Sequence, residues 1–127
     1  PMGMTAHLVY SQIDDRPATL SPVMMQVIRE KIGFDGLVMT DDISMKALSG
    51  SLEDIAAGSI EAGCDVVLLC NASLDDRRAV AAASGPLSGA SEARAARAVT
   101  ARQTPTEVDI PALEAKLDAL ISRRGDG

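Results

Sequence analysis

Aromatic residues make up only 2% of this 127-residue chain, which has no tryptophan, one tyrosine (Tyr10) and one phenylalanine (Phe34). Hydrophobic residues still account for 46%, so aliphatic and methionine side chains are numerous enough to form a core. The chain also lacks a signal-peptide pattern and any apolar run of the roughly 20 residues that a membrane-spanning helix requires. We therefore expect no membrane partner.

Positive charge is scarce as well, because the formal net charge is −6 and no basic patch occurs. This balance disfavours nucleic acids and anionic membranes as partners. Arg94, Arg97 and Arg102 are spread around one predicted helix, and we expect them on a solvated face. Cys64 and Cys70 lack the spacing of metal ligands, so we expect free, buried thiols in a reducing compartment, which favours a cytoplasmic location.

Short apolar runs that suit buried strands alternate with longer runs that suit amphipathic helices. The predicted strands are residues 3–10, 37–39 and 66–69, and the predicted helices between and after them are residues 22–32, 52–62 and 74–83. This alternation favours an α/β fold with a parallel sheet. Two more helices are predicted, at residues 91–103 and after Asp109, and we expect the apolar stripe of the last one to pack onto the body of the protein.

Capping residues mark the ends of these helices. The predicted N-caps are Ser21 (with Pro22 next to it), Ser51, Ser73 and Asp109, and the predicted stop is Gly63. Ser51 and Ser73 are each followed three residues later by an aspartate, which is a capping-box pattern.

The run Gly33 to Met45 holds the most informative chemistry. An apolar strand there ends in Thr40, Asp41 and Asp42, and ligands bind at the carboxyl ends of parallel strands. Neighbouring strand residues point to opposite sides, so we expect one aspartate to face a pocket and the other to brace the loop. The same pattern fits an aspartate that caps the following helix. Position alone leaves both interpretations open.

Three segments resemble the β-N-acetylglucosaminidases of glycoside hydrolase family 3, which are NagZ-like β-hexosaminidases. They read MTAHLVYSQIDDRPATLSP, GFDGLVMTDDISMKAL and AAGSIEAGCDVVLLCN, and they lie in this order within residues 4–83. The resemblance implies that Asp41 is the nucleophile of a retaining glycosidase, which forms a covalent glycosyl-enzyme that water then displaces. It implies neither metal nor organic cofactor. It also implies a substrate with terminal β-linked N-acetylglucosamine, from peptidoglycan fragments in cell-wall recycling.

The chain departs from the family pattern at the acid/base. The resemblance implies a histidine in an upstream loop reading roughly Lys-His-Phe-Pro-Gly-His-Gly, whereas His7 is the only histidine here. We predict that His7 either touches the sugar or is a structural histidine in a strand-end hydrogen-bond network, with a substitute acid/base role as a further alternative. Few rings are present for stacking on a sugar, and Met45 is expected to line the pocket or to fill the core.

Length limits the fold that the resemblance implies. A complete (β/α)8 TIM barrel needs about 250 residues, so this chain corresponds to a partial barrel, the last three β/α units, followed by C-terminal helices. We expect residues 1–90 to be the C-terminal part of the barrel domain and residues 91–127 to be a helical extension. Unpaired strand edges predict self-association, unless the missing upstream half of the barrel is supplied.

Two other functions fit the sequence. The chain could be a catalytically silent, truncated or split module that acts only with a complementary upstream half. Alternatively, the segment Asp41 to Ser44 could be an acidic loop that binds Mg²⁺ in a phosphotransferase-like site, because carboxylates at a strand end ligate hard cations.

Overall fold

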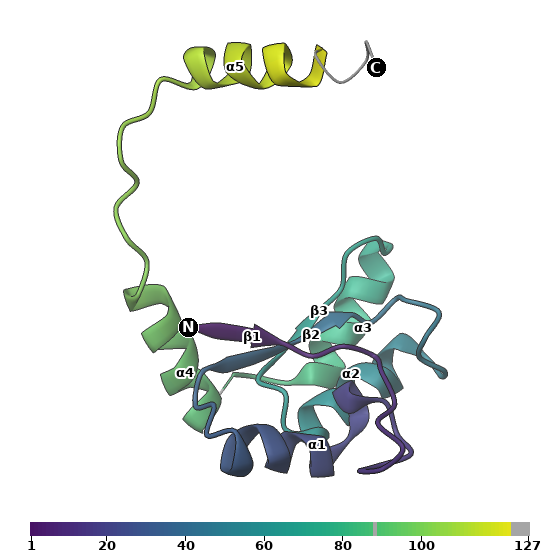
Figure 1. Cartoon of the computed structure of the whole chain (residues 1–127). Coiled ribbons are helices and arrows are strands. Elements are labelled where there is room, and N and C mark those ends of the chain that lie inside the picture. The colour runs from purple at the N-terminus through teal and green to yellow at the C-terminus, as the bar shows by residue number, and fades with distance from the viewer. Residues whose placement is uncertain (88, 123–127) are drawn as a thin grey trace.

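The computed structural model describes residues 1–87 and 89–122. A three-stranded parallel sheet lies at its centre, with strands β1 (Met2–Met4), β2 (Leu37–Asp42) and β3 (Val66–Leu68) in the order β1-β2-β3. Met39 of β2 lies opposite Met4 of β1 and Val66 of β3. Helices connect the strands, as Figure 1 shows, so the predicted α/β class with a parallel sheet is confirmed.

The first strand is shorter than the prediction of residues 3–10, because β1 ends at Met4. Beyond it, the side chains of Thr5 and His7 both turn to the buried hydroxyl of Thr19, at 2.9 and 2.8 Å. These side-chain hydrogen bonds, together with backbone hydrogen bonds from the Thr5 N–H to Met39 at 2.9 Å and from the Ala18 N–H to Leu8 at 2.8 Å, hold this segment against the rest of the protein.

Helices α1 (Pro22–Gln26), α2 (Leu52–Ala62) and α3 (Leu74–Ser84) cover one face of the sheet (Figure 1). A 3-10 turn, η1 (Ala18–Leu20), precedes α1, and a π-helical turn, η2 (Val27–Lys31), completes the helix predicted over residues 22–32. Two buried clusters fill the space beneath the helices. One consists of Ile43, Leu48, Ile55, Ala56 and Val80, and the other of Met25, Val38, Ala62 and Cys64.

The predicted helix caps are confirmed. In each case the side-chain oxygen of the cap accepts the N–H three residues on: Ser21 from Met24 at 3.0 Å, Ser51 from Asp54 at 3.1 Å, Ser73 from Asp76 at 3.1 Å and Asp109 from Ala112 at 3.0 Å. Gly63 ends α2 with a φ of 115°, a conformation in which a side chain would be strained. Local chemistry thus sets where these elements begin and end.

The opposite face of the sheet is uncovered around β1, whereas Leu37 of β2 on the same face is only 5% exposed. Alternation along the strands places Met2, Met4 and Met39 on this face, away from Val38 and the helices. Met2 and Met4 are 54% and 55% exposed. An apolar sheet face in contact with water is unusual for a complete domain, because sheets bury such faces against another layer.

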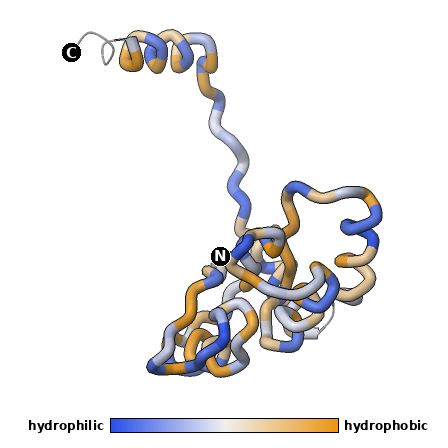
Figure 2. The backbone as a smooth tube through the Cα atoms, turned by 90° about the vertical axis from the view of Figure 1, so that its right-hand side faces the viewer, coloured by the Kyte–Doolittle hydropathy of each residue, from blue (hydrophilic) through white to orange (hydrophobic). Residues whose placement is uncertain are grey.

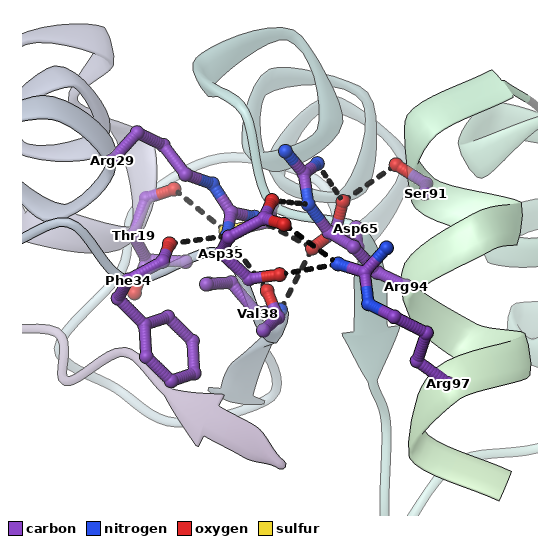
Figure 3. Close-up of polar contacts among 11 residues, drawn as sticks. Thr19, Arg29, Phe34, Asp35, Val38, Asp65, Ser91, Arg94 and Arg97 are labelled. Atoms are coloured by element: carbon purple, nitrogen blue, oxygen red, sulfur yellow. Dashed lines mark hydrogen bonds and ion pairs between the residues drawn. The ribbon is translucent and has the colours of Figure 1, made fainter. Parts of the chain in front are cut away.

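A fourth helix, α4 (Gly89–Thr100), is held against the amino end of the sheet, where β2 and β3 begin, by charged side chains (Figure 3). Asp65 just before β3, with its side chain 1% exposed, accepts hydrogen bonds from Arg94 at 3.0 Å and Ser91 at 2.6 Å on α4, and from Arg29 at 2.7 Å on η2. The expectation of a solvated face is therefore wrong for Arg94, whose side chain is only 19% exposed. Arg97 also has a partner, since it pairs with Asp35 at 2.9 Å.

The last helix, α5 (Ile110–Ser122), stands apart from the body at the end of an extended segment, residues 101–109 (Figure 1). Hydrophobic and hydrophilic residues alternate along it (Figure 2). Its apolar residues remain 54–60% exposed, so the expected packing of this stripe onto the body is not found. The exposed residues are Ile110, Leu113, Leu117, Leu120 and Ile121. Within residues 1–87 and 89–122, no helix combines the length and apolar character needed to cross a bilayer.

Candidate active site

The two aspartates of interest lie where β2 ends, next to an irregularity in its pairing with β3. The register between these strands shifts between Met39 and Asp42. At the shift, the fully buried hydroxyl of Thr40 accepts the backbone N–H of Leu68 at 2.9 Å, taking the place of a backbone carbonyl. Strand irregularities of this kind re-aim side chains, and here the aspartates follow directly.

Asp42 braces the loop that leaves the strand. Its carboxylate accepts the N–H of Ser44 at 3.1 Å, the hydroxyl of Ser44 at 2.8 Å and the N–H of Cys70 at 3.3 Å. The Ser44 N–H in particular lowers the pKa of Asp42 below its usual value, since these donors favour the charged form more than partial burial opposes it. Asp42 thus joins the end of β2 to the segment after β3, which is the bracing role expected for one of the pair.

Asp41 is bound much more loosely. Its Oδ1 accepts the N–H of Asp42 at 2.8 Å, and among the described residues its Oδ2 has no hydrogen-bond partner. The side chain is partly exposed. Asp41 does not cap the next helix, because Ser51 caps α2, so the capping interpretation is wrong for this residue. A carboxylate with one fixed and one free oxygen is suited to bind or attack a ligand.

His7 lies next to the backbone of Asp42 and is buried, with 9% of its surface exposed. Its Nδ1 is 2.8 Å from the Thr19 hydroxyl, and its Nε2 is 3.0 Å from the backbone oxygen of Asp42. Both ring nitrogens therefore have partners within the protein. This geometry agrees with the structural alternative for His7, and direct contact with a sugar stays a prediction.

Met45 sits in the loop that follows the strand. Its N–H donates to the backbone oxygen of Asp42 at 3.1 Å, and its side chain is 46% exposed. The alternative of a core-filling methionine is therefore wrong. An exposed methionine four residues after Asp41 remains consistent with a pocket wall, which stays a prediction.

The cysteines separate into two environments. Cys64 is buried, and the loss of solvent raises the pKa of its thiol to about 12. Cys70 is exposed beside Asp42, so the expectation of two buried thiols is wrong for this residue. Within residues 1–87 and 89–122, no three His, Cys, Asp or Glu side chains gather in a way that could hold a metal ion.

Two features of the site were missed from the sequence. The fully buried hydroxyl of Thr19 contacts the side chains of both Thr5 and His7. The hydroxyl of Thr40 accepts a backbone N–H of β3. The spacing of Thr5 and His7, two residues apart on one side of an extended segment, is the signal that could have linked them. No local pattern marks Thr19 as their shared partner.

A cavity of about 460 Å³ lies elsewhere, along the outer edge of β3 between α3 and the start of α4. Its walls include Val66, Leu69, Val80 and Leu87, and Asp41 is not among them. Size alone would favour this cavity as a ligand site. We favour the carboxyl end of β2, because the polar groups able to act on a ligand gather there.

Fold and site together define an α/β domain with two aspartates at the carboxyl end of the central strand of a parallel sheet. The family model described as "Glycosyl hydrolase family 3 N terminal domain" matches residues 2–101. The chain belongs to glycosyl hydrolase family 3, and the resemblance of its three segments is confirmed.

Individual relatives agree with this assignment. A β-hexosaminidase from Neisseria meningitidis is 45% identical over 71 residues, covering 54% of this chain and 20% of that protein. NagZ from Neisseria gonorrhoeae, solved with N-trifluoroacetyl-D-glucosamine, superimposes with a TM-score of 0.60 at 31% identity, covering 77% of this chain and 32% of the other. A family 3 β-N-acetylglucosaminidase from Paenibacillus gives a TM-score of 0.66 at 28% identity, over 86% of this chain and 24% of the other. The chain thus spans about a fifth of the length of the curated relatives it matches.

Proposed function

We propose that this chain is the nucleophile-bearing part of a retaining β-N-acetylglucosaminidase, with Asp41 as the nucleophile. The observation that carries the proposal is the asymmetry of its carboxylate, in which the Asp42 N–H holds Oδ1 while Oδ2 has no partner among the described residues. Its place at the carboxyl end of a strand and the names of its relatives support the same role.

The chemistry follows from that geometry. The Asp41 carboxylate attacks the anomeric carbon, the bond to the leaving oxygen breaks, and an acid protonates that oxygen. Water, deprotonated by the same group, then displaces the carboxylate and restores the configuration. His7 is poorly placed for the acid/base role, because both its ring nitrogens have partners in the protein. We therefore assign this role to the upstream loop that the family resemblance implies.

Terminal β-linked N-acetylglucosamine is the proposed substrate, released from peptidoglycan fragments in the cytoplasm during cell-wall recycling. The N-acetylglucosamine analogue bound by the Neisseria gonorrhoeae relative supports the sugar. Met45 and His7 are proposed to line the sugar site. Met45 is exposed after the end of β2, and His7 lies 3.0 Å from the backbone oxygen of Asp42.

The open sheet face supports the proposed partial barrel. Its exposed methionines and the outer edges of β1 and β3 are where the remaining strands of a barrel would pack and pair. We propose that the chain needs this upstream half for activity and self-associates without it. This need agrees with the alternative of a truncated or split module that is silent by itself and acts only with that half.

The domain boundary is a related proposal. Because Arg94 and Ser91 of α4 bind the buried Asp65, we propose that the barrel part extends to about Thr100, beyond the expected limit at residue 90. The family match, which ends at residue 101, is consistent with this limit. The Mg²⁺-dependent alternative has no comparable support, since the described residues offer no three-ligand cluster.

Turnover of a chromogenic N-acetyl-β-glucosaminide tests the proposal. We expect activity when the chain is combined with an upstream half, and a loss of at least about a thousandfold in kcat for Asp41→Asn. Asp75→Asn is the matched control, because Asp75 is a carboxylate with a 92% exposed side chain on α3, and it should leave kcat unchanged. Full activity of Asp41→Asn would contradict the assignment. Turnover only in the combined protein would identify a split module, absence of turnover there would contradict the proposed function, and phosphate release dependent on Mg²⁺ would favour the third function.

A further inference from the structure

A chain of buried polar side chains connects the first segment of the protein to the backbone beside Asp41. Thr5 and His7 both contact the Thr19 hydroxyl, at 2.9 and 2.8 Å, and His7 continues to the Asp42 carbonyl at 3.0 Å. Thr5, His7 and Thr19 are 6%, 9% and 0% exposed. Buried polar groups are costly unless they are paired, so a network with every member satisfied fixes the position of each part.

The direction of the hydrogen bond to Asp42 follows from what its partners can do. A carbonyl oxygen only accepts, so the Nε2 of His7 must carry a proton and donate it to Asp42. The one hydroxyl proton of Thr19 has two acceptors within reach, Nδ1 of His7 at 2.8 Å and the Ala6 carbonyl at 3.3 Å. The contacts therefore fix the proton on Nε2, which is the ring nitrogen that faces Asp42.

The backbone of Asp42 is where this network meets the nucleophile. Its carbonyl is held by His7 Nε2 and by the Met45 N–H, while its own N–H holds Oδ1 of Asp41 at 2.8 Å. Rotation of the backbone at residue 42 would turn the N–H away from Asp41 and release the carboxylate.

We propose that His7 is a positioning residue, which fixes the backbone of Asp42 and through it aims the free Oδ2 of Asp41 at the anomeric carbon. This inference rests on the proposed function, because it gives a purpose to the orientation of Asp41. It assigns to His7 a role that differs from sugar contact and from proton transfer. A displacement of the attacking atom by about 1 Å is enough to slow a reaction up to a hundredfold, so such positioning has measurable consequences.

Two substitutions separate the contacts of His7. His7→Gln places an amide N–H near the position of Nε2 and keeps a donor for Asp42. His7→Asn is shorter, so it reaches the Nδ1 position and Thr19 but leaves the Asp42 carbonyl without this donor. Both variants are polar and similar in size, so they form a matched pair.

Two measurements on the 127-residue chain test the network without requiring activity. Nitrogen-15 NMR of the wild type reads the tautomer directly, because His7 is the only histidine. We expect a proton on Nε2, and an unprotonated Nε2 would overturn the proposal even if no variant folds. The second measurement is hydrogen exchange of backbone amides, with Asp42 as the reporter and Val38 as the control. Val38 lies at the other end of β2, and its N–H binds Asp65 at 2.8 Å.

We expect the Asp42 amide to exchange about tenfold faster in His7→Asn, with Val38 unchanged, and to stay within about threefold of wild type in His7→Gln. Equal acceleration of both amides would mean that His7 serves general stability, and it would overturn the proposal. An unchanged Asp42 amide in His7→Asn would do the same.

Kinetics then connect the network to catalysis. In the chain combined with an upstream half, His7→Asn should lower kcat about tenfold at unchanged KM, and His7→Gln should restore most of it. A rise in KM alone would instead identify His7 as a sugar contact and overturn the positioning role. If the wild-type combination shows no turnover, the proposed function fails, and the tautomer and amide exchange still decide whether His7 positions Asp42.

Discussion

Asp65→Asn is expected to destabilise the protein strongly although it changes one atom of one side chain. The Asp65 carboxylate is 1% exposed and joins Arg29, Arg94, Ser91 and the backbone N–H of Val38. The substitution removes the negative charge between Arg29 and Arg94, whose side chains are 18% and 19% exposed. It also places an amide N–H where an acceptor is needed. Each guanidinium then lies partly buried without its full counter-charge.

The expected size follows from that burial. Removing one partner of a buried ion pair costs about 3–5 kcal/mol, and since both arginines keep some contact with water we expect about 3 kcal/mol. For a domain of this size with a urea m-value near 1.3 kcal/mol/M, this is a shift of about 2 M in the unfolding midpoint. Asp75→Asn removes an exposed ion pair with Arg78 and should cost less than about 0.5 kcal/mol. A loss at Asp65 no larger than this control would refute the reasoning.

The same contacts predict a pH dependence. Burial raises the pKa of Asp65, but hydrogen bonds from Ser91, Val38 and the two arginines outweigh it and lower the pKa below its usual value. Because the folded-state pKa is the lower one, the stabilisation is complete above about pH 4 and is lost as the pH falls through the folded-state pKa. The difference in unfolding free energy between wild type and Asp65→Asn should therefore shrink below about pH 4. A difference that grows in acid would contradict the sign.

Three further predictions follow from burial and capping. A thiol reagent at pH 8 should label one cysteine per folded chain, Cys70, and a second only in urea, because Cys64 is buried and the pKa of its thiol is about 12; rapid labelling of both in the folded state would contradict this. Ser21→Ala removes the cap of α1 and the 2.6 Å hydrogen bond to Asp14, and should lower the free energy of unfolding by about 1–2 kcal/mol in urea titrations. Deleting residues 102–127 should change the urea midpoint little, since α5 contacts no core, whereas deleting residues 91–127 removes Arg94 and Ser91 and should unfold most of the chain; similar midpoints for the two deletions would favour the boundary at residue 90.

The features that were predictable from the sequence are those set by neighbouring residues. Ser21, Ser51 and Ser73 cap helices because each cap bonds an N–H only three residues away. The alternation of strands and helices follows from the period of the apolar residues in the same way. The family segments added the family, which the match over residues 2–101 confirms.

Features that depend on distant partners could not be predicted. Arg94 faces a carboxylate 29 residues earlier in the chain, and nothing in its own helix distinguishes it from an arginine in water. His7 donates to a carbonyl 35 residues away, and no pattern near His7 in the sequence marks this partner. The apolar stripe of α5 has the period of a helix that packs onto a core, yet no other part of the described chain covers it.

Covalent trapping of the nucleophile tests the central claim most directly. A fluorinated N-acetylglucosaminyl donor with a good leaving group slows the release of the sugar, so the glycosyl-enzyme accumulates and can be digested and analysed by mass spectrometry. The account predicts one sugar per chain, attached to Asp41 in the combined protein and absent from Asp41→Asn. Attachment to Asp42, or continued turnover with no adduct on either aspartate, would contradict it.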